Sequence, residues 1–500
     1  MNFTSRSYKI LFALLGAILL FNLFFGLNNV PLESYDESRH GVNAVEALES
    51  GNYLLNTWNG QPDYFNLKPV LSYWPQMLGF KIFGLNPFGL RFFSGVEMFI
   101  CFGLLTWFCY KQKGLPFALL TAALLVSSPR LITRHGGRSG DADALFICLY
   151  VLALIFILWD NKSYFKYCVA SFVAGLAFLT KSFHIMPLCL TVIIFYLMDF
   201  KLSRKAALNG MLCVLCFLGP VLAWAALRYQ YDGTAFFEQM LFKDVFQRVS
   251  EEMEGLKRGY YFYFIKVLQA FPLWLGGLLF MFIAFIRLNS ISLKKGGKKQ
   301  SIFSYLAIKD KFLQRLLIIV LVPFVAYTIS TSKLEWYIYP SYPFLAMLLA
   351  AGFLYYGPLI LKFCPAWKIS LSALLLICFL GSQGIVFANL HEMLNREDAG
   401  QDAVMEMAAR KKPAQVAYLF VDGKRTEWRQ SPILRAKMYD NIVLMPGGNS
   451  AYQACLPQGQ QEQQDHQGQQ GHQDYQGQQG QQDHQGQQEL AALKSLHYEW

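Results

Sequence analysis

The sequence predicts an all-α polytopic membrane bundle of about 11–13 transmembrane helices, with a small outer-facing C-terminal α/β region and a disordered Gln-rich tract. Three observations predict this fold. Hydrophobic residues make up 54% of the 500 residues and charged residues only 15%, whereas about a quarter of a soluble domain is charged. Apolar stretches of nearly membrane-spanning length recur through residues 1–388. Glutamine dominates residues 456–488, which cannot bury a core.

Eleven apolar stretches are predicted to cross the membrane. The first follows Arg6 and Lys9, and no small-residue cleavage site is evident after it. This pattern is typical of a retained signal-anchor helix. The predicted spans are 9–27, 88–110, 116–133, 143–159, 167–180, 183–199, 210–228, 263–287, 316–331, 338–356 and 369–388.

The loops between the spans predict which side faces the cytoplasm. Every second loop is rich in lysine and arginine and poor in acids, as the positive-inside rule describes for cytoplasmic loops. The rule places the N-terminus in the cytoplasm and the C-terminal region in the periplasm. These loops also explain the net charge of +11, and no long basic face remains for a nucleic acid. The cytoplasmic set is Arg6/Lys9, Lys111/Lys113, Lys162/Lys166, Lys201/Arg204/Lys205, Lys294/Lys295/Lys298/Lys299 and Lys362/Lys368.

Two long outer loops, 28–87 and 229–262, belong to the predicted transmembrane domain. In the first loop, the spacing of apolar residues predicts a helix over 38–50. The apolar segment 70–83 is too short to cross the bilayer easily, so we expect an interfacial or re-entrant helix there. The second loop mixes aromatic and charged residues, which favours a helix that lies along the headgroups.

Three further segments follow the predicted transmembrane domain 1–388. Residues 389–455 are expected to form a small soluble α/β region, 456–488 the disordered Gln-rich tract and 489–500 a C-terminal tail. The elements predicted in the soluble region are a helix over 396–411 and strands over 415–421 and 441–445.

The first chemical candidates lie in the first outer loop. Asp36 and Glu37 come directly before the predicted helix, where a helix N-terminus can hold an anion. Simple helix capping is the alternative explanation. Lys68 precedes the rigid Pro69 at membrane depth, which suits a phosphate group. Its alternative role is an interfacial lysine that extends its charge to the headgroups.

Further candidates lie in the other outer loops. The segment 134–143 is glycine-rich, so its backbone could approach a ligand closely, and Asp143 opens an apolar helix. An acid at the edge of a span is costly unless it is paired or functional. Lys181, Arg248 and Lys333 come from separate outer loops. Together with Lys68 of the first loop, these cations would hold an anionic leaving group such as a lipid phosphate.

Four motifs, in this order and spacing, resemble the polyprenyl-phosphate-sugar glycosyltransferases of the GT-C type. The relatives are the protein O-mannosyltransferases and, more closely, the bacterial lipid A aminoarabinose transferases, families 39 and 83. The resemblance covers about residues 8–390 and is weak from 400 onward. The motifs are YDESRHGVNAVEALESGNYLLNTWNG, NLKPVLSYWPQMLGFKIFGLNPFGLRFFS, GLAFLTKS and SKLEWYIYPSYPFLAML.

The resemblance implies roles for individual residues. Asp36 and Glu37 match the catalytic acid motif, with Asp36 as general base or as the carboxylate that orients the acceptor. Asp143 matches the acid that opens the fourth span and is the third catalytic candidate. The candidates for binding the donor phosphate are Lys68, Lys181, Arg248 and Lys333.

The sequence departs from the aminoarabinose transferases at their metal site. Those enzymes hold a divalent metal with a glutamate just before the Lys-Pro motif and a histidine in the later loop. Here Leu67 takes the first position, and the loop 229–262 contains no histidine. A divalent metal stays possible as a cofactor, but no residue is assigned as its ligand.

These observations predict an integral membrane glycosyltransferase. It would move a sugar from a polyprenyl (undecaprenyl) monophosphate donor onto a lipid A, glycan or protein acceptor at the periplasmic face of the inner membrane. Its partners would be these substrates and membrane lipids, with no nucleic acid. A lipid or glycan transporter is one alternative, although such a protein needs ionisable residues near the bilayer midplane. An O-antigen ligase or polymerase with a diphosphate-linked donor is the other.

Overall fold

The computed structural model of the chain divides into two compact units. The helical unit consists of Met1–Pro31 and His40–Arg396, and the C-terminal unit of Leu32–Arg39 and Glu397–Trp500. The residues that the structure describes are 5–159, 163–201, 203–247, 258–294, 310–409, 415–419, 430–439 and 442–446.

Within these described ranges, eight helical stretches are long and apolar enough to cross a membrane. Two shorter apolar helices, α5 (Leu115–Val126) and α7 (Asp143–Leu158), accompany them. Each of the eleven predicted spans overlaps one of these helices, because one stretch contains both α8 and α9. The prediction of a polytopic helical membrane fold is therefore confirmed. The long helices are α1 (Ser5–Phe24), α4 (Pro87–Lys113), α8 (Tyr164–Lys181), α9 (Met186–Asp199), α10 (Arg204–Asp232), α14 (Pro272–Lys294), α16 (Lys311–Ile329), α17 (Tyr342–Phe363) and α18 (Lys368–Leu394).

Prolines move two of the predicted boundaries. The span predicted over 116–133 ends early, because α5 stops at Val126 and Pro129 starts a new short helix. The span predicted over 263–287 is broken before Pro272, which has no N–H to continue a helix. The short helices are η1 (Val70–Ser72), α3 (Trp74–Phe83), α6 (Pro129–Ile132), η2 (Ser182–Ile185), α11 (Ala235–Leu241), η3 (Phe242–Gln247), α13 (Phe262–Ala270), η5 (Glu335–Ser341) and η6 (Pro365–Trp367).

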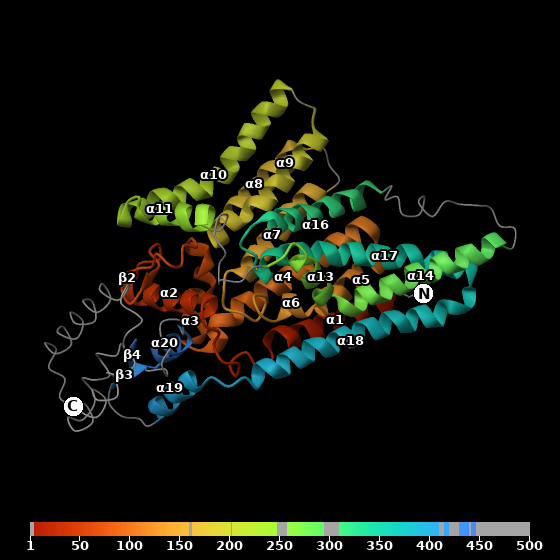
Figure 1. Cartoon of the computed structure of the whole chain (residues 1–500). Helices are drawn as coiled ribbons and strands as arrows, with labels where there is room; N and C mark the ends of the chain where they lie inside the picture. The colour runs from red at the N-terminus through yellow and green to blue at the C-terminus, as the bar shows by residue number, and fades with distance from the viewer. Residues whose placement is uncertain are drawn as a thin grey trace, which may run out of the picture. The chain divides into compact units, whose positions relative to one another are not determined.

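A glycine brings α8 close to α10, and α8 also packs against α7 (Figure 1). A Cβ atom on Gly175 would lie 2.4 Å from the Phe217 carbonyl oxygen and 2.7 Å from the Pro220 ring. Small residues at such crossings let two backbones approach inside a membrane. This contact helps to fix the C-terminal half of α8, which ends at Lys181, relative to α10.

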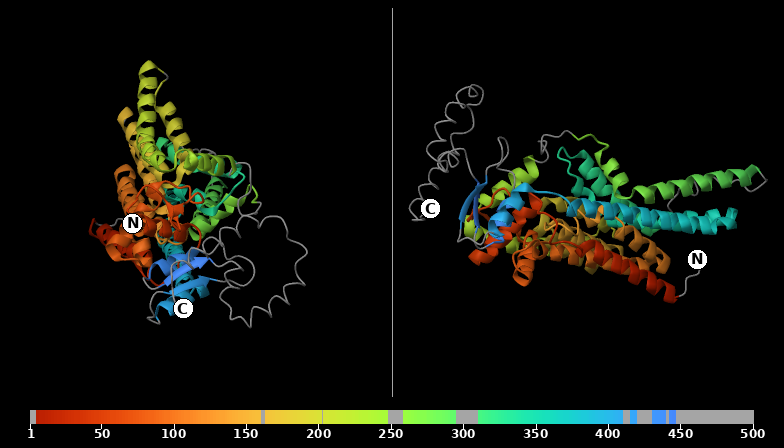
Figure 2. Two further views of the ribbon diagram at one scale, coloured as in Figure 1. Left: turned by 90° about the vertical axis from the view of Figure 1, so that its left-hand side faces the viewer. Right: turned by 90° about the horizontal axis from the view of Figure 1, so that it is seen from below.

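A polar contact ties together helices on the opposite side of the bundle. The side chains of Asn22 in α1 and Gln383 in α18 exchange hydrogen bonds of 2.8 and 3.3 Å. Asn22 also donates to the Val126 carbonyl of α5 at 3.1 Å. Because all three groups are buried away from water, each gains its partner inside the protein. In Figure 2, the axes of α1 (red), α14 (green) and α18 (cyan) are nearly aligned.

The first outer loop contains a helix and a hairpin. Helix α2 (Asp36–Ser50) coincides with the helix predicted over 38–50 and begins two residues earlier. Strands β1 (Thr57–Trp58) and β2 (Gln61–Pro62) pair antiparallel across Asn59-Gly60, both with positive φ. Asn-Gly at such a turn is a strong hairpin signal, which the polar composition of this stretch concealed.

The C-terminal unit contains two helices and two strands in its described residues. Helices α19 (Ala399–Ala409) and α20 (Gln430–Lys437) pack together. Strands β3 (Gln415–Leu419) and β4 (Ile442–Pro446) pair in parallel, in segments where strands were predicted. The predicted tract 456–488 and tail 489–500 lie outside the described residues.

Candidate active site

The loop between α6 and α7 presents two aspartates at the start of α7. Asp141 accepts a hydrogen bond from the Asp143 N–H at 3.0 Å and another from the Ser139 hydroxyl at 2.9 Å. Both carboxylates are buried. The N-terminus of α7 carries a partial positive charge, which stabilises acids placed there.

His135 joins these two carboxylates. Its Nδ1 lies 2.8 Å from Asp141 Oδ2 and 3.2 Å from Asp143 Oδ2. Its ring stacks on Trp336 of η5 with a centroid distance of 3.8 Å. The backbone of His135 has φ of +51°, a left-handed conformation that a non-glycine residue adopts only when its surroundings hold it.

The glycines of this loop serve packing rather than the approach to a ligand that the sequence suggested. A Cβ atom on Gly137 would lie 2.3 Å from Leu23, and one on Gly140 would lie 2.5 Å from Leu90. The loop therefore folds against the end of α1 and the start of α4. This packing holds the His135–Asp143 segment in place.

Lys181 at the end of α8 completes the cluster. Its Nζ forms an ion pair with Asp143 Oδ1, and both side chains are buried. The next residue, Ser182, has φ of +45° and donates from its hydroxyl to Asp244 at 2.8 Å. The helix is thus turned away directly after Lys181, which leaves the ammonium group beside the acids.

The two carboxylates of this cluster face two cations. Burial by itself would lower the pKa of His135, but Asp141 and Asp143 outweigh it and raise that pKa to about 10. The imidazole is therefore protonated at neutral pH. Two negative and two positive charges then balance in a buried site, which ion pairs require in order to be stable.

The same cluster has the geometry to hold a divalent cation. Ligand atoms of His135, Asp141 and Asp143 all lie within 4.8 Å of one another, and imidazole with carboxylates is a ligand set that zinc accepts. A metal ion has to displace the proton on His135. At pH 7 this costs on the order of 4 kcal/mol, or about a thousandfold in apparent affinity.

A second set of charged residues surrounds Trp336. Glu335 pairs with Arg130 of α6 at 2.9 Å and with Lys266 of α13 at 2.7 Å. These pairs fix η5, so Trp336 stays against His135. The segment SKLEWYIYP is one of the motifs in the sequence, but no role could be predicted for Glu335 or Trp336, because their partners lie in other loops.

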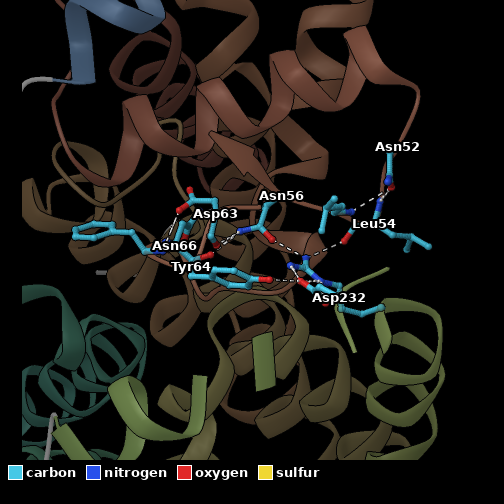
Figure 3. A network of polar contacts seen from close by, with 10 residues as sticks. Asn52, Leu54, Asn56, Asp63, Tyr64, Asn66 and Asp232 are labelled. Atoms are coloured by element: carbon cyan, nitrogen blue, oxygen red, sulfur yellow. Dashed lines mark hydrogen bonds and ion pairs between the residues drawn. The ribbon is translucent and has the colours of Figure 1, made fainter. Parts of the chain in front are cut away.

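The loop that contains the β1–β2 hairpin and leads to Lys68, here called the hairpin loop, is held to the C-terminal end of α10. Arg228 is fully buried and donates to Asp232 at 2.8 Å and to the Asn56 side chain at 2.7 Å. Its guanidinium group also lies 4.0 Å from the centre of the Phe236 ring. Figure 3 shows Asn56 and Tyr64 of the hairpin loop and Asp232 of α10 meeting where the loop contacts this helix.

Asp63 organises the rest of the hairpin loop. Its carboxylate accepts hydrogen bonds from the backbone N–H groups of Phe65 and Asn66 and from the Asn43 side chain, at 2.9 to 3.2 Å. Asn66 in turn donates to Asn43 at 2.8 Å. The backbone that leads to Lys68 is therefore firmly held two residues ahead of it (Figure 3).

Among the predicted site residues that the structure describes in the helical unit, Asp143 and Lys181 form an ion pair. Lys68 is partly buried behind the hairpin. Lys333 donates to the Ser330 carbonyl at 2.6 Å within its own loop. Arg248 lies outside the described residues.

Asp36 and Glu37 belong to the C-terminal unit, at the start of α2. The Glu37 carboxylate accepts from the Glu33 N–H at 2.7 Å. This carboxylate therefore binds the backbone of the segment that precedes α2, and the catalytic role of Glu37 stays a prediction. Asp36 is partly buried, and its catalytic role stays a prediction.

The fold and part of the sequence match known glycosyltransferases. The crystal structure of ArnT from Cupriavidus metallidurans bound to undecaprenyl phosphate superposes with a TM-score of 0.65 at 17% identity, covering 90% of this chain and 88% of that one. The model of the family "Dolichyl-phosphate-mannose-protein mannosyltransferase" matches residues 67–224, which include Lys68, Asp143 and Lys181. The chain therefore has the polytopic helical fold of these GT-C glycosyltransferases, as its motifs predicted.

Two individual proteins are similar to this chain along more than half of its length. An undecaprenyl phosphate-α-4-amino-4-deoxy-L-arabinose arabinosyl transferase of Aeromonas hydrophila is 25% identical over 400 residues, 78% of this chain and 69% of that protein. A protein of Aquifex aeolicus described as uncharacterized is 26% identical over 348 residues, 68% of this chain. The match spans 63% of that relative's length, less than two thirds.

Proposed function

We propose that the protein is an integral membrane glycosyltransferase that uses an undecaprenyl monophosphate-linked sugar as its donor. The observation that carries this proposal is the buried cluster in which Lys181 pairs with Asp143 at the start of α7. Group transfer from a lipid phosphate requires cations that neutralise the leaving group. The similarity to an undecaprenyl phosphate-dependent arabinosyl transferase supports the same donor class.

The reaction we propose is an in-line displacement at the anomeric carbon. The bond from this carbon to the phosphate oxygen breaks while a bond to the acceptor oxygen or nitrogen forms. Asp36 takes the proton when the acceptor is a hydroxyl. The electron pair leaves with the polyprenyl phosphate, and the four predicted cations neutralise it: Lys68, Lys181, Arg248 and Lys333.

Pairing with Asp143 leaves Lys181 able to act on a phosphate. An ammonium group has three N–H donors, and the ion pair with Asp143 uses one of them. The remaining donors can meet a donor phosphate without breaking the pair. Asp143 then holds the ammonium group in one orientation, so less ordering is needed when the substrate binds.

We propose that the protein lies in the inner membrane with the active site at the periplasmic face. The lysine-rich loops support a cytoplasmic N-terminus and a periplasmic C-terminal unit. Lipid A, a glycan or a protein at that face is the acceptor. Lipid A is favoured among them, since the aminoarabinose transferase of Aeromonas hydrophila is similar along 78% of this chain.

The test is transfer from a radiolabelled undecaprenyl-phosphate sugar pool in membranes that contain the protein. We expect the wild type to consume the lipid, and Asp36→Asn and Lys68→Ala to be expressed but to retain only a small residual rate. Lys205→Ala is the matched control, because it changes an exposed lysine in the first turn of α10, far along that helix from the hairpin loop at its C-terminal end. Normal turnover in both site variants would contradict the roles proposed for these residues, and a wild type without transfer would contradict the function.

A further inference from the structure

Side chains of the C-terminal unit hold the segment that leads to Asp36. This unit includes Leu32–Arg39 together with the chain after Arg396. Sequence analysis assigned no function to the C-terminal region. Its helices nevertheless contact the backbone that immediately precedes the predicted catalytic carboxylates.

The first contact is a two-way hydrogen bond between Gln401 of α19 and the backbone of Leu32. The Leu32 N–H donates to Gln401 Oε1 at 2.9 Å, and Gln401 Nε2 donates to the Leu32 carbonyl at 2.9 Å. A primary amide satisfies both groups in the way that a neighbouring β-strand would. Gln401 is 1% exposed, so neither group can exchange this partner for water without opening the unit.

Gln401 itself is held by two further residues. Its Nε2 donates to Asp398 at 2.8 Å, and its Oε1 accepts from Arg435 of α20 at 3.1 Å. These contacts fix which end of the amide faces the Leu32 N–H. The amide is therefore preorganised for the backbone it binds.

The second contact falls on the residue directly before Asp36. The Tyr35 N–H donates to Gln430 Oε1 of α20 at 2.6 Å. Tyr35 has φ of +68°, a left-handed conformation that costs on the order of 1–3 kcal/mol in a non-glycine residue unless its surroundings hold it. Gln430 is buried and supplies such a hold.

A third contact lies between these two. The hydroxyl groups of Ser34 and Ser431 are 2.9 Å apart, and the Ser431 hydroxyl donates to Asp398 at 3.3 Å. Asp398 thus supports both Gln401 and Ser431. Three successive points of the segment, at residues 32, 34 and 35, are bound by α19 and α20.

These contacts determine where α2 begins. After the Tyr35 turn, the Arg39 N–H donates to the Tyr35 carbonyl at 2.9 Å, which closes the first helical turn around Asp36. Glu37, in the same turn, accepts a hydrogen bond from the Glu33 N–H of the preceding segment. A change in the Tyr35 conformation would redirect the Asp36 side chain.

From this geometry we infer that Gln401 and Gln430 are positioning residues for Asp36, and that the C-terminal unit is needed for the chemical step. The inference rests on the proposed function, in which Asp36 is the base. In that proposed function the donor phosphate is bound by other residues: Lys68, Lys181, Arg248 and Lys333. Loss of the contacts that Gln401 and Gln430 make with Leu32 and Tyr35 should therefore lower kcat and leave KM for the donor nearly unchanged.

The test uses Gln401→Leu and Gln430→Leu in the full-length protein, purified in detergent. Leucine nearly keeps the side-chain volume and removes both the donor and the acceptor. Since a misplacement of about 1 Å can cost on the order of a hundredfold in rate, we expect kcat to fall at least about tenfold, with KM for the lipid-linked donor within about threefold. Asp402→Ala is the control, because Asp402 is exposed on the same helix.

A double variant separates positioning from simple structural damage. If Gln401 acts through Asp36, adding Gln401→Leu to Asp36→Asn should cause no further loss of the residual rate. A structural defect would lower that rate again. If Gln401→Leu fails to fold, Gln430→Leu carries the same test, since Gln430 binds the backbone of Tyr35, the residue directly before Asp36.

The outcomes are distinguishable. A wild type that transfers sugar, with both glutamine variants at wild-type kcat, would overturn the inference and leave the proposed function standing. A further loss in the double variant would also overturn it. A wild type that transfers no sugar would overturn the proposed function, and the inference with it.

Discussion

Lys181 and Asp143, 38 residues apart in the sequence, form an ion pair in which the two side chains are only 3% and 4% exposed. Each comes from the end of a different helix, α8 and α7. Removing one partner of a buried pair leaves an uncompensated charge and costs about 3–5 kcal/mol, whereas replacing both is far milder. This asymmetry allows stability and activity to be separated.

We predict that Lys181→Met lowers the melting temperature strongly and that adding Asp143→Asn restores most of the loss. Transfer activity should stay at least about a hundredfold below the wild type in both proteins, because the phosphate has lost a cation. Thermal unfolding in detergent and the transfer assay measure the two effects. Recovery of activity together with stability in the double variant would show that the pair is only structural.

The stability of the protein should depend on the protonation of His135. Its pKa is raised from about 6.5 to about 10 in the folded protein. The stabilisation is therefore complete below about pH 6.5 and is lost as the pH rises through 10. We expect the melting temperature to fall from pH 6.5 to 10, and to fall less in His135→Phe, which keeps the stacking on Trp336 but carries no charge. Equal slopes in the two proteins would contradict this account.

Divalent metal should not be required for transfer. Leu67 replaces the glutamate of the related metal site, and a metal at His135, Asp141 and Asp143 has to displace a tightly held proton. We expect activity in excess EDTA to stay within about twofold of the untreated enzyme. Loss of activity that zinc restores in the wild type, but not in His135→Ala, would assign the metal to this cluster.

Arg228 should control the placement of Lys68. Arg228→Met removes the bonds to Asp232, Asn56 and the Leu54 carbonyl. We expect faster hydrogen exchange over residues 52–66 and a KM for the donor raised about tenfold, since the loop before Lys68 is released. Arg204→Met is the control, because Arg204 is exposed at the other end of α10. Unchanged exchange in Arg228→Met would mean that other contacts, such as those of Asp63 and of Lys243 with the Tyr64 carbonyl, are enough to hold the loop.

The approach of α8 and α10 should tolerate no side chain at Gly175. A Cβ there would lie 2.4 Å from a backbone oxygen, which cannot move away cheaply. Gly175→Leu is expected to destabilise the protein by about 3 kcal/mol or more. Gly219→Ala in α10 has open space around it and should be neutral or slightly stabilising. The melting temperatures of the two variants test this prediction, and an equal melting temperature in both would contradict it.

Hydropathy and the spacing of apolar residues were sufficient to predict the membrane helices and helix α2. These features depend on local composition, because a bilayer requires each span to satisfy its own backbone hydrogen bonds. Each of the eleven predicted spans overlaps a helix. Prolines 129 and 272 moved two boundaries, and the Asn59-Gly60 hairpin went unpredicted because its strands have only two residues each.

The sequence by itself determined the class of fold and the presence of Asp143 and Lys181 at the ends of two helices. The tertiary structure alone decided that these two side chains form an ion pair, that His135 bridges two carboxylates, and that Gln401 binds Leu32, which is 369 residues away. A hydrogen bond or an ion pair depends on distances of a few tenths of an ångström between groups on different elements. No pattern of neighbouring residues encodes such distances, because they arise only when helices pack.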